Sequence, residues 1–331
     1  MDYKVFPQMN TLVRIQESTL LSYAQKAELS RKTGVDDFYK ALISTGFFHY
    51  AKPAGFHDLI AALEEETRGW LNWAKKISPD IRIAEIFEIP FVTHNVGVFV
   101  KEQLLDRKLT ELYFDNTVYT ATQLSRTVNT KNTVQLLPLD ESIRLTIEDA
   151  LSDFKIHQSF SRVALLIKFF GHCALAKLSE QIGDEDISRF IASYIDLEML
   201  SVLMQQRAAK QPLNEWLLTK TTGGKLRSLI LPLFHASNTE QDSALRGTPY
   251  ASVWAKSNDQ NTLHLFEVYA DDYLIELCKK AKLEAFGLFP LLAFIYVKLS
   301  DIKNIRILAA AKQVGVGPEE TTERLRIGYE L

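Results

Sequence analysis

The 331-residue chain is poor in residues that break regular structure or cross-link it. It holds only 14 glycines and 10 prolines, too few for the frequent turns of an all-β fold. Its two cysteines, Cys173 and Cys278, exclude a disulfide scaffold and fit a reducing compartment. The formal net charge of -3 gives no excess of positive charge of the kind typical of nucleic-acid-binding proteins.

Long apolar runs are also missing. The longest uncharged stretch, residues 285–297, is too short to span a bilayer and contains Gly287 and Pro290. The first residues, MDYKVFPQMN, lack the apolar run of a signal peptide. The sequence therefore predicts a soluble, cytoplasmic protein, and its length predicts two or three domains.

Helix-forming residues dominate what remains, and apolar residues recur at helical spacing. Asp36 is the expected N-cap of a helix that places Phe38, Ala41 and Leu42 on one face. No segment alternates as a strand would, so we predict an all-α fold. The polar stretch 233–260 is expected to be an exposed loop region. The other long helical patterns cover residues 56–77, 161–182 and 271–299.

One helical unit occurs three times. Aligning Asn95, Met199 and Asn304, at offsets of 104 and 105 residues, also aligns apolar residues at several following positions. Each unit has a turn before the helix and a break with an acidic residue after it. This period is the size of a whole small domain, too long for a solenoid repeat. The aligned turn residues are Pro79, Gly183 and Leu288, the aligned acidic residues are Glu111, Glu215 and Glu320, and Pro212 and Pro318 lie where following helices would begin.

We therefore predict three similar helical-bundle domains, residues 1–112, 113–217 and 218–331. Repeated head-to-tail contacts close into a ring when the rotation between repeats suits. A funnel with pseudo-threefold symmetry around a central axis is the expected arrangement, although an open curved array would give the same sequence pattern.

Motifs for catalysis or cofactor binding are not found. TTGGKL, residues 221–226, lacks the first glycine of a phosphate-binding loop, because Thr219 stands there, and Leu226 replaces its Ser or Thr. His172 and Cys173 are neighbours on a helix and point apart, so they are interpreted as core residues. The histidines are scattered without metal-binding spacing. We expect no catalytic residue, no cofactor and no metal.

One enzymatic alternative rests on Asp271, Asp272 and Glu276. In a helical protein such acids could hold magnesium and a diphosphate. That chemistry needs a second carboxylate group, and Asp36-Asp37 is explained by a helix start. A solvated helix face is the simpler interpretation, with the lysines that follow as partners: Lys279, Lys280 and Lys282.

The last long helix carries two stripes. The apolar stripe suits burial, and Asn304 beside it must find a hydrogen-bond partner if it is buried. Alternatively, Lys303 and Arg306 face a central opening and meet an acidic partner. The apolar stripe comprises Ile302, Ile305, Leu308 and Ala309, and the polar one Lys303, Arg306 and Gln313.

The C-terminal segment LFPLLAFIYVKLSDIKNIRILAAAKQVGVGPEETTERL resembles the signature of the C subunit of V-type and A-type rotary ATPases, which is the d subunit of eukaryotes. LRGTPYASVW and HNVGVFVKEQL resemble further segments of that family, and the sequence departs from its pattern at Met199 and Val316. The residues that match the C-terminal signature are Asp301, Lys303, Asn304, Ile305, Arg306, Ile307, Gly317, Pro318, Glu319, Glu320, Arg324 and Leu325.

The resemblance implies a noncatalytic, funnel-shaped subunit of the central stalk. Such a subunit sits on the membrane rotor ring of c/K subunits, on the cytoplasmic face, and receives the shaft subunits D and F in a central socket. It transmits torque for ion transport or ATP synthesis. We expect the Asn95, Glu198 and Asn304 helix starts, with Lys303 and Arg306, to line or support that socket.

A free cytosolic helical adaptor is the alternative to a rotor subunit, because it would share the composition and the lack of catalytic motifs. The two classes differ in what they bind. A rotor subunit should co-purify with a shaft subunit or a membrane ring, and an adaptor with neither.

Overall fold

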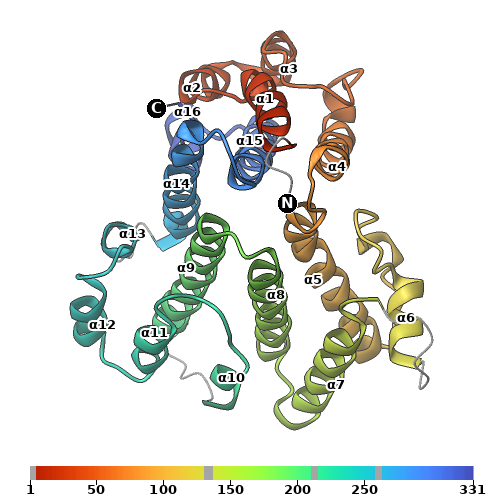
Figure 1. Ribbon diagram of the computed structural model, residues 1–331, viewed down its shortest axis with the longest axis vertical. Helices are drawn as coiled ribbons and strands as arrows, with labels where there is room; N and C mark the ends of the chain where they lie inside the picture. Colours follow the sequence, from red (N-terminus) through yellow and green to blue (C-terminus); the bar gives the residue numbers. More distant parts are fainter. Residues whose placement is uncertain (1–4, 130–136, 210–214, 258–262, 331) are drawn as a thin grey trace.

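The computed structural model describes residues 5–129, 137–209, 215–257 and 263–330 (Figure 1). Over these residues the regular structure is helical and contains no strand, which confirms the predicted all-α class. The longest helices lie around the middle of the view in Figure 1, and the shorter ones lie outside them. Pro212 lies outside the described residues.

Six helices form a closed circuit of three consecutive pairs. Within each pair the two helices pack together, as α4 does with α5, α8 with α9, and α14 with α15. Each pair also contacts the next, through α5 with α8, α9 with α14, and α15 with α4. The last contact joins the end of the chain to its beginning and closes the ring. The bounds are α4 Leu59–Ile77, α5 Arg82–Leu105, α8 Phe160–Ile182, α9 Glu185–Ala209, α14 Phe266–Lys279 and α15 Phe289–Val314.

Shorter helices precede each pair and pack on the long helix of the pair before it. Thus α7 contacts α5, α11 contacts α9, and α3 contacts α15. Each outer lobe therefore combines the end of one sequence repeat with the start of the next. These helices are α1 Val5–Gln16, α2 Tyr23–Arg31, α3 Gly34–Ser44, α6 Ala121–Asn129, α7 Asp140–His157, α11 Arg227–Leu233, α12 Asn238–Leu245 and α13 Ala251–Ser257. The other short elements are α10 Glu215–Thr219, α16 Pro318–Glu323, η1 Glu17–Thr19, η2 Phe56–Asp58, η3 Thr110–Leu112, η4 Leu263–Leu265 and η5 Lys280–Leu283.

The three-repeat prediction fits this circuit. The aligned turn residues Pro79, Gly183 and Leu288 each lie just before a long helix: α5, α9 or α15. Gly183 ends α8 with a left-handed conformation, φ 70°, which glycine adopts at no steric cost. Each sequence repeat contains one helix pair. The boundaries at residues 112 and 217, and exact pseudo-threefold symmetry, stay predictions.

Two buried lysines hold the N-terminal segment against α15. The Lys26 ammonium contacts Asp301 Oδ1 at 2.9 Å and donates to the Ile327 carbonyl at 2.8 Å. Asp301 Oδ2 also accepts from the Leu21 N–H at 2.8 Å. Lys298 donates to the Phe47 carbonyl at 3.1 Å, and burial lowers its pKa to about 8. These contacts secure the junction at which the ring closes.

The closing junction also has its own apolar core. It packs α2, α3 and α4 against α15, and it contains Leu29, Phe38 and Leu42 from the N-terminal part. The predicted apolar stripe of the last long helix is confirmed, because its four members are buried. They are Ile302, Ile305, Leu308 and Ala309.

Two predictions about the shorter helices were wrong. The stretch expected to be a loop contains α12 and α13, with Tyr250 and Trp254 buried. A capping box explains the first of these helices, because the Ser237 hydroxyl caps it and the Glu240 side chain binds back. Asp36 lies in the first turn of α3 and is not its N-cap, which is Thr33.

Helix α5 is long and apolar enough to cross a membrane by length and composition. Yet 61% of its most apolar window is buried against the rest of the protein. A helix that is apolar on all sides belongs either in a bilayer or in a large core. Since α5 packs against α4, α7 and α8, its apolar surface is explained by the core.

Candidate partner-binding site

A central cavity of about 330 Å³ lies where the long helices meet. Its walls come from α5, α8, α9, α14 and α15, and they are mostly apolar. Two of the aligned triples converge on it. Phe87, Ile191 and Tyr296 form the first, and the second lies about one turn further along the helices: Pro90, Tyr194 and Leu299.

The meeting of aligned residues in one cavity shows how the three repeats are arranged. The alignment was set by sequence alone, through Asn95 and its two counterparts, and it brings side chains from three separate helices to one space. An open array would not place all three long helices around one cavity. The cavity therefore lies where the three repeats meet.

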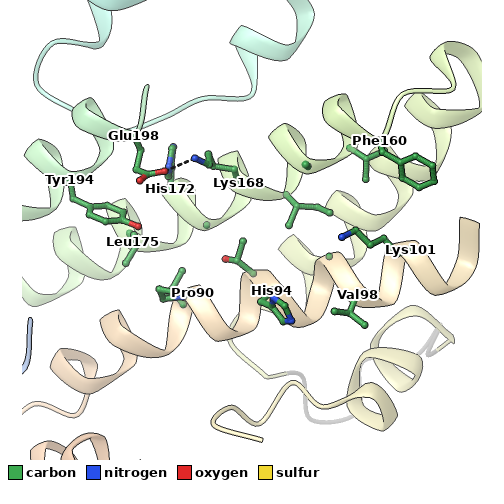
Figure 2. A pocket seen from close by; sticks show the side chains of 17 residues that line it. Pro90, His94, Val98, Lys101, Phe160, Lys168, His172, Leu175, Tyr194 and Glu198 are labelled. Carbon is green, nitrogen blue, oxygen red and sulfur yellow. Dashed lines mark hydrogen bonds and ion pairs between the residues drawn. The ribbon is translucent and has the colours of Figure 1, made fainter. Parts of the chain in front are cut away.

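A second cavity, which we call the side pocket, adjoins the first between α5 and α8 (Figure 2). Its volume is about 380 Å³, and it shares Pro90, Leu175 and Tyr194 with the central cavity. Its walls are apolar and its rim is polar. Figure 2 shows Lys101 on α5 with its ammonium directed into the space between the two helices.

The polar groups of the side pocket differ in how well they are satisfied. Lys168 and Glu198 form an ion pair at 2.5 Å, drawn in Figure 2. His172 is 3% exposed, and its Nδ1 has no hydrogen-bond partner among the described residues. Burial, with a smaller contribution from Lys168, lowers the pKa of His172 to about 3, so the ring is neutral. The prediction of core residues is confirmed for the burial of His172, but the hydrogen bonding of His172 is incomplete and Cys173 beside it is only half-buried.

Charged residues rim the central cavity on its α14–α15 side. Asp271 on α14 accepts from the Tyr296 hydroxyl at 3.1 Å and from Lys303 Nζ at 2.9 Å. It also binds Arg326 Nε at 2.8 Å. The sequence had suggested Lys279 and its neighbours as partners of this acidic turn. That holds for Glu276, which pairs with Lys279, but Asp271 binds cations from α15 and the C-terminal segment instead.

This arrangement also bears on the magnesium alternative. Asp272 accepts from the Ile327 N–H at 2.9 Å, and burial raises its pKa to about 6. Asp271 is already bound by two cationic side chains. Within the described residues, no group of three or more potential metal ligands comes together. The three acids therefore serve contacts within the chain.

The predicted site residues Asn95 and Asn304 lie in the middle of α5 and α15, not at helix starts as expected, and both are fully buried. Each binds the backbone of a segment that follows its helix. Asn95 Oδ1 accepts from the Phe114 N–H and its Nδ2 donates to the Phe114 carbonyl, both at 2.9 Å. Asn304 makes the same two contacts with Arg326, at 2.9 and 3.5 Å. The two asparagines thus support the wall of the cavity without lining it.

The other three predicted residues are more accessible. Glu198 lines the side pocket, in the middle of α9 and not at a helix start, and Lys303 lines the central cavity. Arg306 lies about one turn beyond Lys303 on α15 and is half-buried. Its Nε is buried and has no hydrogen-bond partner among the described residues.

Sequence reasoning did not assign similar contacts to two aspartates, although Asp301 matches the C-terminal signature. Asp196 and Asp301 are aligned in the repeat register, and each accepts backbone N–H groups from the start of a neighbouring lobe. Asp196 binds the Lys225 and Leu226 N–H groups at 3.1 and 3.2 Å. The sequence could have revealed them, because both aspartates occupy the same position of an apolar helix, three residues before the aligned Met199 and Asn304.

The structure thus belongs to the class of helical scaffolds with a central cavity. The chain belongs to the family described as ATP synthase (C/AC39) subunit, whose family model matches residues 9–324. It is 24% identical to the C subunit of the V-type sodium ATPase of Enterococcus hirae over 98% of this chain and 99% of that protein. It is 22% identical to the C subunit of the A-type ATP synthase of Methanocaldococcus jannaschii, over 96% and 86% respectively. The resemblance found in the sequence is confirmed.

Proposed function

We propose that this chain is the noncatalytic central-stalk subunit of a rotary ATPase that joins shaft subunits D and F to the membrane rotor ring. The closed circuit of helix pairs around a central cavity carries the proposal. A closed, densely packed ring resists twisting better than an open array, and a rotor part must transmit torque without slipping. The family membership supports the same assignment.

The two ends of the ring suit different partners. Residues closer to the starts of α5, α9 and α15 make the cavity apolar, whereas Lys101, Glu198 and Lys303 follow further along these helices. The shaft is therefore proposed to enter from the end at which these polar residues lie.

The opposite end gathers the turns that precede the long helices. Arg82 Nη1 donates to the Gln181 carbonyl at 2.5 Å, and Asn10 Nδ2 to the Ala285 carbonyl at 3.0 Å, so these turns and α1 adjoin. Large apolar side chains are exposed there, at 53% for Ile81, 84% for Leu283 and 61% for Phe286. Exposed apolar clusters typically mark interaction sites. We assign this end to the membrane rotor ring, which makes the chain peripheral to the membrane on its cytoplasmic face.

Co-purification tests the proposal. An affinity-tagged chain, expressed with the other subunits of its rotary ATPase, should retain both the shaft and the membrane ring after solubilisation in mild detergent. An interface of at least about 1,000 Å² on each side is expected for stable coupling. Recovery of the chain with neither partner would refute the assignment and favour a free adaptor.

A further inference from the structure

The ring consists of three similar sectors, each formed where one helix pair contacts the next: α5 with α8, α9 with α14, and α15 with α4. The side pocket lies in the α5–α8 sector. The alignment places Gly97 of α5 opposite Ser201 of α9 and Arg306 of α15. A Cβ built on Gly97 would meet Ile167 only at 3.9 Å, so the missing side chain leaves free space in the pocket wall. At the same register position, the other two sectors carry larger side chains. The three sectors are thus distinguishable to anything that enters the ring.

The aligned residues at the polar end differ in charge as well. One position of the repeat alignment holds three different polar groups: the imidazole of His94, the carboxylate of Glu198 and the ammonium of Lys303. Glu198 and Lys303 are bound within the chain, by Lys168 and Asp271. Lys101, about two turns beyond His94 on α5, forms no ion pair with any described residue. The α5–α8 sector therefore offers a cation at the pocket rim that is available to a partner.

The chemistry of the side pocket defines what fits it. Its apolar walls accept a large apolar side chain, and Lys101 at the rim attracts a carboxylate. Two buried polar atoms in it, His172 Nδ1 and Thr93 Oγ1, have no hydrogen-bond partner among the described residues. Buried polar groups are normally satisfied, so a partner group that reached these atoms would supply the hydrogen bonds that they lack. A helix end with an apolar residue next to an acidic one matches all these features.

We propose that the side pocket binds one apolar side chain beside a carboxylate at the end of the shaft and so fixes the shaft's rotational orientation in the ring. This inference rests on the proposed function. Without such a feature, three similar sectors would accept the shaft in three orientations about 120° apart, and rotation would begin from a mixture of states. The pocket makes one orientation more stable than the other two.

The test compares two substitutions at the same register position. Gly97→Leu fills the pocket, and Ser201→Leu adds the same side chain on α9, away from it. Binding of the full-length variants to purified D–F shaft is measured by biolayer interferometry, and the orientation by electron cryo-microscopy of the assembled complex. We expect about tenfold weaker binding for Gly97→Leu, since burial of one apolar side chain is lost, and more than one orientation. Ser201→Leu should keep wild-type affinity and a single orientation.

A second pair of variants changes only exposed residues, so that a loss of binding cannot be caused by misfolding. Lys101→Glu reverses the rim charge, and Lys177→Glu makes the same change on the exposed side of α8, outside the pocket. Only the first should slow association, by about tenfold at low salt and less at high salt. If Gly97→Leu and Lys101→Glu both behave as their controls, the side pocket does not orient the shaft, although the proposed function stands. If the wild-type chain binds no shaft, both proposals fall.

Discussion

The junction that closes the ring depends on a buried ion pair, and its removal has a calculable cost. Lys26 and Asp301 are both fully buried and 2.9 Å apart. Asp301→Ala leaves the Lys26 ammonium without its counterion and the Leu21 N–H without its acceptor. Breaking one partner of a buried pair costs about 3–5 kcal/mol, and an unsatisfied buried N–H about 1–3 kcal/mol more. This is a large part of the stability of a typical protein, about 5–15 kcal/mol.

A double variant separates the charge from the packing. In Lys26→Met with Asp301→Leu both charges of the pair are gone, the Leu21 N–H and the Ile327 carbonyl lose their partners, and the buried Lys298 loses the attraction of Asp301. We expect the double variant to recover about 2 kcal/mol relative to Asp301→Ala. The assay is urea unfolding of the isolated chain followed by circular dichroism, with free energies compared at equal m-values.

The control is an exposed pair of the same kind. Glu320 and Arg324 lie 2.8 Å apart on the surface, with side chains 59% and 49% exposed. Glu320→Ala should change stability by less than about 1 kcal/mol. The reasoning is refuted if Asp301→Ala costs no more than this control, or if the double variant is less stable than the single one.

Three further outcomes are expected. Gly224→Ala should destabilise the chain by several kcal/mol in the same unfolding assay, about 2 kcal/mol or more beyond the control Gly46→Ala. Both glycines have positive φ, so both variants strain the backbone. Only at Gly224 would the new Cβ clash, 2.3 Å from a carboxylate oxygen, because a Cβ on Gly46 meets nothing within 4 Å. Burial lowers the pKa of Lys298 to about 8, so between pH 8 and 10.5 the unfolded chain binds one proton more than the native chain at this group. The native state should therefore become more stable as the pH rises through that window, by on the order of 3 kcal/mol. Lys298→Met should abolish that part of the pH dependence of unfolding. Arg306→Glu should weaken shaft binding in a pull-down, with Lys177→Glu as the control, and unchanged binding would remove Arg306 from the site.

The sequence predicted the architecture where its signals were periodic. The helical class followed from apolar spacing, and the turns before α5, α9 and α15 followed from Pro79, Gly183 and Leu288. The register also aligns residues that the structure brings together around the central cavity, such as Phe87, Ile191 and Tyr296. Such signals are visible because burial of a helix face requires the same spacing in every repeat.

What the sequence did not show depends on contacts between distant segments. The stretch from 233 to 260 is polar, so its helices were missed, although the buried Tyr250 between α12 and α13 donates a hydrogen bond to Asp196 at 3.0 Å. The socket prediction named Asn95 and Asn304 as the starts of repeated helices, but both lie in the middle of a helix. They are buried to bind backbone groups of later segments, and the pairing partner of a buried amide cannot be read from spacing alone. The side pocket was missed because it arises from an absent side chain, at Gly97.

One outer lobe combines the first helices of the chain with its last long helix, and this has a consequence for biosynthesis. Leu29, Phe38 and Leu42 share an apolar cluster with Ile302, Ile305 and Leu308 of α15, more than 250 positions later in the chain. At translation rates of about 5–20 residues per second, these early helices leave the ribosome roughly 10–50 s before the segment that covers them exists. During that interval their apolar faces are open to chaperones and to aggregation. Completion of the native state therefore waits for the end of synthesis, and a ribosome that stalls before α15 releases a chain that cannot mature.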